Sequence, residues 1–110
     1  MLTRKIFEEQ LEKTLDSYHD ATKDLIYQAK GLRFCQGLPL CALIDYYDID
    51  LMIESGVCRG MSTEIICSYT KDKPVHHVAI DIDHYGKGVF QSAIDRLQPQ
   101  YPRLKFLSGD

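Results

Sequence analysis

The sequence predicts an α/β fold in which helices precede a small parallel sheet. After an N-terminal helical region, apolar runs typical of strands alternate with helical stretches, in the order strand, helix, strand, helix, strand. Strands that alternate with helices in this way pair in parallel and are joined by right-handed crossovers. The length of 110 residues suits one folding unit, and hydrophobic residues make up 45% of it, which is enough for a core.

The N-terminal region is expected to be helical. Through residues 4–30, apolar or small side chains recur at steps of three and four, close to the helical period of 3.6 residues. This stripe consists of Phe7, Leu11, Leu15, Tyr18, Thr22, Leu25, Ala29 and Leu32. Asp20 allows either one bent helix or two helices in series. Residues 33–40, which include Gly37 and Pro39, are expected to form a loop.

We therefore divide the chain into an N-terminal helical segment, residues 1–38, and an α/β part, residues 39–110. In the second part, a short helix opened by Pro39 comes first. The predicted strands are residues 50–54, 75–82 and 104–107, and the predicted helices between them are residues 61–69 and 89–97. A parallel sheet normally has more strands and both faces covered. Because this sequence ends on its third strand, we expect the N-terminal half of a longer domain, with an exposed sheet edge that favours self-association.

Composition and charge narrow the class of protein. A net charge of -3 argues against a nucleic-acid or membrane-surface binder that depends on electrostatic attraction. The sequence has neither an apolar run of the roughly 20 residues that span a bilayer nor the apolar core of a signal peptide. Because there is no secretion signal, we expect the four cysteines to be reduced thiols in a cytoplasmic protein, and because none forms a C-x-x-C pair, we expect no metal site.

The turn between the first predicted strand and the next helix carries most of the chemistry. Residues 54–63 read Glu-Ser-Gly-Val-Cys-Arg-Gly-Met-Ser-Thr. Gly56 permits a tight turn and the close approach of a ligand, and Gly60 permits the helix start to pack closely against the strand. The free N–H groups of the helix start favour an anion, whereas Glu54 suits an ammonium or hydroxyl group. A ligand with an amino acid moiety fits both features.

A second acidic residue lies at the end of the second predicted strand. Asp81 is placed to accept hydrogen bonds from both hydroxyls of a ribose, as acidic residues do in dinucleotide-binding folds. Ligands of open α/β sheets bind outside the carboxyl ends of the strands, where Glu54 and Asp81 both lie. An amino acid group together with a ribose indicates S-adenosylmethionine rather than a dinucleotide.

Three segments resemble the class I S-adenosylmethionine-dependent methyltransferases. Glu54-x-Gly56-x-x-x-Gly60-x-Ser62 resembles their first motif, and Val-Ala-Ile-Asp-Ile-Asp at residues 78–83 resembles the second. Residues 106–110 are similar to the strand and turn near the adenine. Within this family, the motifs are most similar to those of small-molecule O-methyltransferases of the catechol type and of the cephalosporin-hydroxylase-like branch. Over residues 39–110, the resemblance implies a partial Rossmann-like sheet that lacks the C-terminal half of the usual seven-stranded domain.

The resemblance implies S-adenosylmethionine as cofactor and assigns nine residues to it. They are Glu54, Gly56, Val57, Cys58, Gly60, Ser62, Asp81, Ile82 and Asp110. Glu54 would hold the methionine end, directly or through water, and Ser62 would meet the carboxylate. Gly56, Val57 and Cys58 would line the path of the cofactor with their backbone. Asp81 would bind the ribose hydroxyls, Ile82 would pack on the adenine, and Asp110 would approach its amino group.

The sequence also departs from the family. Cys58 stands where the commonest form of the first motif has its middle glycine. The fourth to seventh strands of the family, which supply the acceptor pocket, any catalytic base and any metal ligands, are absent. We therefore expect the S-adenosylmethionine-binding portion of a methyltransferase for a small-molecule acceptor, inactive as this fragment because transfer requires that both substrates be positioned. The alternatives are a non-catalytic α/β interaction module or a truncated product without independent activity.

Other chemistry fits the residues less well. A nicotinamide dinucleotide motif would need glycine at positions 58 and 61, which are Cys58 and Met61. His76 and His77 are adjacent on a strand, so they point to opposite faces and do not readily chelate one ion. We expect Asp81 to bind ribose rather than a cation, Asp83 to serve in a turn or cap, and Cys58 to be an inert thiol.

Overall fold

In the computed structural model of the protein, the described residues are 1–25, 32–57, 60–82 and 88–109. The elements, in chain order, are α1 (Arg4–Thr22), η1 (Lys23–Leu25), α3 (Leu32–Tyr46), β1 (Leu51–Ser55), α4 (Met61–Thr70), β2 (His76–Asp81), α5 (Val89–Leu97) and β3 (Leu104–Ser108). The three strands form one parallel sheet in the order β1-β2-β3. The predicted α/β class, with N-terminal helices before a three-stranded parallel sheet, is confirmed.

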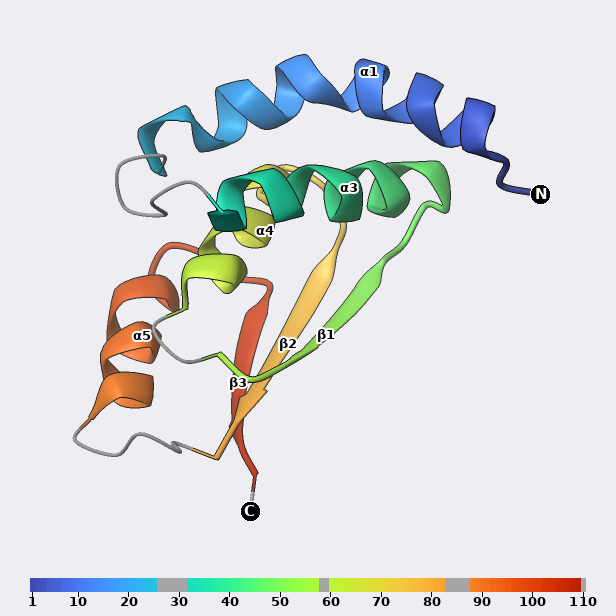
Figure 1. Ribbon diagram of the computed structural model, residues 1–110. Helices are drawn as coiled ribbons and strands as arrows, with labels where there is room; N and C mark the ends of the chain where they lie inside the picture. The colour runs from blue at the N-terminus through green and yellow to red at the C-terminus, as the bar shows by residue number, and fades with distance from the viewer. Residues whose placement is uncertain (26–31, 58–59, 83–87, 110) are drawn as a thin grey trace.

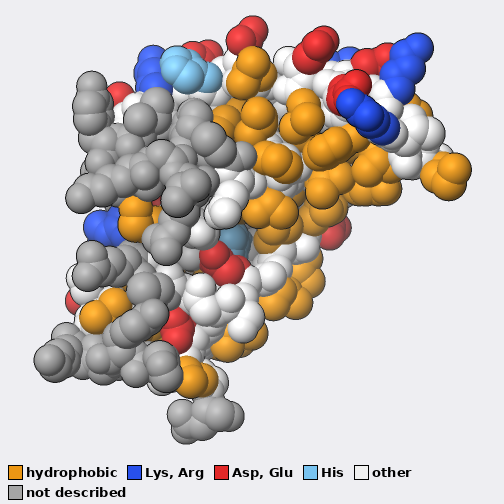
Figure 2. All heavy atoms as spheres, viewed as in Figure 1, with side chains coloured by type: hydrophobic (Ala, Val, Ile, Leu, Met, Phe, Trp, Pro, Cys, Tyr) orange, Lys and Arg blue, Asp and Glu red, His pale blue; other side chains and the backbone are white. Residues whose placement is uncertain are grey.

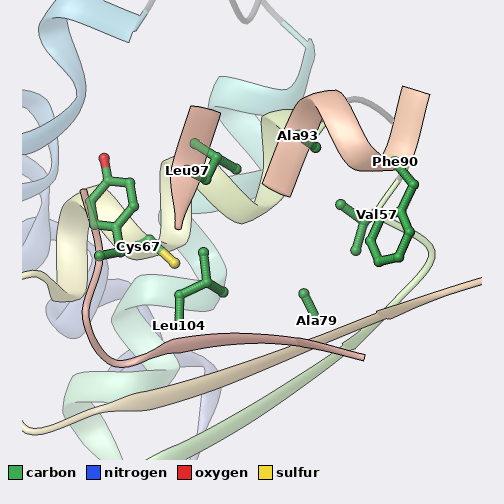
Figure 3. Packing of buried hydrophobic residues seen from close by; sticks show 8 residues of the cluster. Val57, Cys67, Ala79, Phe90, Ala93, Leu97 and Leu104 are labelled. Carbon is green, nitrogen blue, oxygen red and sulfur yellow. The ribbon is translucent and has the colours of Figure 1, made fainter. Parts of the chain in front are cut away.

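Helices α4 and α5 cover the same face of the sheet. Both crossovers advance in one direction across the sheet, and two right-handed crossovers of that kind place their helices on one side. Figure 3 shows Phe90, Ala93 and Leu97 of α5 facing the sheet, where Ala79 and Leu104 lie. All five side chains are buried. This packing fixes the carboxyl ends of β1 and β2 relative to the start of α4.

The N-terminal helices lie beside the amino ends of the strands, and the carboxyl ends point away from them (Figure 1). Helix α1 packs on α3 and α4. Tyr18 of α1, Ile44 of α3 and Ile65 of α4 belong to one buried cluster, which Val75 extends to the start of β2. The helices approach closely at Gly37, since a Cβ there would come within 2.7 Å of Ile65 Cγ2. This cluster packs α4 against the N-terminal helices and the start of β2.

The buried stripe of α1 differs from the predicted one. Leu15, which belongs to the predicted stripe, is 49% exposed, whereas Thr14 is buried beside Tyr18 and Thr22. The threonines tolerate burial because their hydroxyls have partners. Thr22 Oγ1 donates to the Tyr18 carbonyl at 2.6 Å, and Gln10 Nε2 donates to Thr14 Oγ1 at 3.1 Å. Among the described stripe residues, only Leu15 departs from the packed face, and the buried Thr14 takes its place.

The predicted loop at residues 33–40 is wrong. Helix α3 continues through it, with Pro39 inside the helix, and the boundary proposed at residue 38 falls within α3. A proline in a helix interior removes one hydrogen bond and costs roughly 3 kcal/mol. The burial of Cys41, Ala42 and Ile44, which follow it in the same helix, offsets that cost.

The second face of the sheet carries exposed apolar side chains. In β1, Leu51 is 53% and Ile53 is 65% exposed, and Leu107 of β3 is 41% exposed. Figure 2 shows hydrophobic side chains gathered on the side of the molecule where α3 and β1 lie. Within the described residues, this face of the sheet is therefore uncovered. None of the described helices combines the length and the apolar character needed to cross a membrane.

We expect the 110-residue chain to self-associate through this face. Parallel sheets are normally covered on both sides, and exposed apolar patches of this kind mark contact surfaces. Light scattering should give a mass above that of one chain, and Ile53→Lys should lower it by placing a charge on the face. Leu15→Lys, which alters an exposed leucine on α1, is the matched control. A monodisperse single chain at high concentration would contradict this prediction.

Candidate functional site

Glu54 and Asp81 lie at the carboxyl ends of two neighbouring strands. Glu54 pairs with Ala79 in the parallel register, and Asp81 follows two residues later in β2. Because side chains alternate along a strand, Ala79 and Asp81 share the face on which Glu54 lies. The predicted meeting of the two acidic residues at one edge and one face of the sheet agrees with this geometry.

The turn after β1 is hydrogen-bonded to the end of β2 through its backbone N–H groups. The Gly56 N–H donates to the Ile80 carbonyl at 2.9 Å, and the Val57 N–H donates to Asp81 Oδ2 at 2.8 Å. The other oxygen, Asp81 Oδ1, accepts from the Ile82 N–H at 2.7 Å. A carboxylate can accept about four hydrogen bonds, so acceptance from these two N–H groups is compatible with further donors. Asp81 thus also has a structural role that its position in the sequence does not reveal.

The two glycines of the turn, Gly56 and Gly60, have different surroundings. Both adopt left-handed backbone conformations, with φ of 86° at Gly56 and 80° at Gly60. Among the described residues, a Cβ at Gly56 would meet nothing within 4 Å, which leaves space for a ligand beside the backbone. A Cβ at Gly60 would come within 2.9 Å of Leu97 Cδ1. Gly60 therefore allows α4 to start close to α5, not close to the strand as the sequence suggested.

Two side chains that the sequence analysis did not assign hold Glu54. Thr63 Oγ1, in the first turn of α4, donates to Glu54 Oε1, and His77 Nε2 lies 3.2 Å from the same oxygen. Both partners are buried, with His77 only 3% exposed, while Glu54 is 18% exposed. The sequence signal for His77 is its even spacing from Asp81, which places both on one face of β2.

The start of α4 presents an acidic side chain as well as backbone amides. Its N-cap, Gly60, makes no side-chain hydrogen bond, and Ser62 is exposed in the first turn, as a carboxylate contact would require. Glu64 lies in the same turn, is only 7% exposed, and accepts from Arg96 Nη1 at 2.6 Å. Glu64 already complements the positive end of the helix, and Arg96 balances its charge. The sequence analysis missed this ion pair.

The remaining predicted site residues are only partly placed. The Val57 side chain is buried in the cluster that includes Phe90, Ala93 and Leu97 of α5, which we call the α5 cluster. Ile82 is 58% exposed directly after Asp81. Cys58, Asp83 and Asp110 lie outside the described residues. His76 is exposed and His77 is buried, which confirms that they point to opposite faces. The described residues contain no group of three or more side chains arranged to hold a metal ion.

Two buried thiols should lower the free energy of unfolding at alkaline pH. Burial, aided by nearby Asp45 for Cys41 and by Glu54 for Cys67, raises the pKa of each thiol from 9.0 to about 12. Unfolded thiols lose their protons from about pH 9, whereas the folded protein retains them until about pH 12. The unfolded state therefore binds fewer protons, and the free energy of unfolding falls as pH rises through this window.

We expect each thiol to lower the free energy of unfolding by about 1.4 kcal/mol per pH unit above about pH 9. Urea unfolding at a series of alkaline pH values measures this slope. Cys67→Ala should flatten it by the contribution of one thiol, whatever the variant does to stability at neutral pH. Equal slopes in the variant and the unaltered protein would show that the Cys67 thiol does not resist ionisation in the fold.

Comparison with known proteins adds no further assignment. No protein-family model, no curated protein and no solved structure matches the chain. The function is therefore argued from the geometry of this site.

Proposed function

We propose that the protein binds S-adenosylmethionine, as the cofactor-binding portion of a methyltransferase for a small-molecule acceptor. One observation carries the proposal. Glu54 and Asp81 lie on one face at the carboxyl ends of adjacent strands, and the left-handed turn at Gly56 lies between them. Ligands of open α/β sheets bind outside this edge.

The chemistry of the donor set fits the parts of the cofactor in order. The Asp81 carboxylate suits the two ribose hydroxyls, and the exposed Ile82 beside it offers an apolar surface to the adenine. The space beside Gly56 admits the sulfonium group close to the backbone. Glu54 suits the ammonium group, and the exposed Ser62 at the start of α4 suits the carboxylate.

The proposal for these 110 residues concerns binding, and we expect no methyl transfer from them. Transfer is a direct displacement that requires the acceptor to be held in line with the methyl group. The residues assigned here all serve the cofactor. The small-molecule acceptor and its binding groups thus remain part of the proposal for the complete enzyme.

Amide NMR spectra recorded during a titration with S-adenosylhomocysteine test the proposed site. We expect the signals of Gly56, Val57, Ser62 and Ile82 to shift together with one dissociation constant, while those of α1 stay unchanged. Shifts gathered instead around the cavity lined by Thr70, Val75 and Tyr101 would contradict the placement. A folded protein with no shifts at millimolar ligand would contradict binding itself.

A second candidate function is a non-catalytic α/β module that acts through protein contact. The exposed apolar face of β1 and β3 favours it, because Ile53 is 65% and Leu107 is 41% exposed. A stable dimer of the chain that fails to bind S-adenosylhomocysteine would support this candidate over the first.

A further inference from the structure

A buried line of side chains runs behind the candidate site and ends on Glu54. Cys67 Sγ of α4 lies 3.7 Å from His77 Nδ1, and His77 Nε2 lies 3.2 Å from Glu54 Oε1. The imidazole ring of His77 thus bridges α4 and β1. Both Cys67 and His77 are less than 5% exposed, so bulk water does not compete for these contacts.

The carboxylate sets the direction of the hydrogen bonds. A carboxylate oxygen only accepts, so the contact of His77 with Glu54 Oε1 is made by an N–H on Nε2. The Thr63 hydroxyl donates to the same oxygen. On the other side of the ring, Cys67 Sγ contacts His77 Nδ1 and holds the imidazole in place.

These two donors fix one oxygen of the carboxylate and leave the other for a ligand. Within the described residues, the hydrogen bonds to Glu54 all end on Oε1. A carboxylate held at one oxygen by two buried donors cannot rotate freely, which lowers the cost of binding a cation at Oε2.

We propose that His77 is a positioning residue, which orients Glu54 so that Oε2 receives the ammonium group of the ligand. This role rests on the proposed function. It adds a residue near the amino end of β2 that contacts no ligand and acts through Glu54.

The test compares two ligands that differ at the amino acid end. S-adenosylhomocysteine carries the ammonium group, and 5′-methylthioadenosine lacks it. By isothermal titration calorimetry, His77→Leu should weaken S-adenosylhomocysteine by about tenfold or more, because an oriented, charged hydrogen bond is lost. Binding of 5′-methylthioadenosine should be unchanged. Glu54→Gln should give the same pattern, and His77→Leu added to Glu54→Gln should weaken binding no further.

Two further variants separate positioning from folding. His77→Gln keeps a side-chain N–H donor and should recover part of the lost affinity, and Thr63→Val should weaken S-adenosylhomocysteine selectively by removing the other donor. His76→Leu, on the opposite face of β2, is the matched control and should bind both ligands normally. Circular dichroism spectra of the variants serve to check that each one is folded.

The outcomes separate this role from the function on which it rests. If His77→Leu and Thr63→Val bind S-adenosylhomocysteine as the unaltered protein does, or weaken both ligands equally, the positioning role is overturned while the proposed function stands. If the unaltered, folded protein binds neither ligand, the proposed function fails, and the positioning role fails with it.

Discussion

Asp81→Asn should abolish most of the affinity for the nucleoside part of the ligand. The amide has one acceptor oxygen in place of two and no charge, so it cannot serve both ribose hydroxyls while accepting from the Val57 and Ile82 N–H groups. Hydrogen bonds to a charged group contribute about 1.5–3 kcal/mol each, so we expect affinity to fall about ten- to a hundredfold. Calorimetry with S-adenosylhomocysteine measures the loss.

A second pair of ligands shows whether the affinity is lost because the ribose contacts are removed or because the turn after β1 is disrupted. The unaltered protein should prefer 5′-methylthioadenosine over its 2′-deoxy analogue, and Asp81→Asn should remove that preference. Asp72→Asn, at an exposed acid in the turn after α4, is the control of equal charge change and should retain it. If Asp81→Asn still discriminates between the two nucleosides, Asp81 does not read the ribose.

Gly60→Ala should be the most destabilising single-methyl change in the turn. A non-glycine residue at φ of 80° costs about 1–2 kcal/mol, and the new Cβ would lie 2.9 Å from Leu97 Cδ1 and 3.2 Å from the Ala93 Cβ. Both neighbours are buried in the α5 cluster and have little room to move. Strain and overpacking together should lower the free energy of unfolding by about 2–4 kcal/mol, as measured by urea denaturation.

Gly88→Ala is the matched control for Gly60→Ala. Gly88 is also the N-cap of its helix, with φ of 76°, but among the described residues its Cβ would meet nothing within 4 Å. It should therefore show only the backbone cost, about 1–2 kcal/mol. If the two variants lose the same stability, the close contact between the start of α4 and α5 does not contribute.

The sequence predicted the sheet better than the helices before it. Strands β1, β2 and β3 fall within one or two residues of their predicted bounds, because short apolar runs ended by glycine or polar residues are strong local signals. The part of α3 before Pro39 was missed because Pro39 is a local helix breaker, whereas the burial of Ile44 and its neighbours is a tertiary effect. Among its described residues, the N-terminal stripe was wrong only at Leu15, because Thr14, a polar residue, is buried there with a hydrogen-bond partner.

The candidate site was also predicted only in part. Parallel strands place their carboxyl ends at one edge, so the meeting of Glu54 and Asp81 follows from topology. His77 lies beside Glu54 because the two residues are diagonal neighbours in the register of β1 and β2. Thr63 reaches Glu54, and Glu64 pairs with Arg96, because α4 and α5 pack on the same face of the sheet, which no motif records.

Calorimetric titration of the unaltered 110-residue protein with S-adenosylhomocysteine, 5′-methylthioadenosine and methionine tests most directly whether one ligand spans both acids. The account predicts saturable binding of one S-adenosylhomocysteine per chain, weaker binding of the nucleoside and the weakest binding of methionine, because each part engages only one acidic residue. A protein that is folded by circular dichroism yet shows no saturable heat with S-adenosylhomocysteine at millimolar concentration would contradict it.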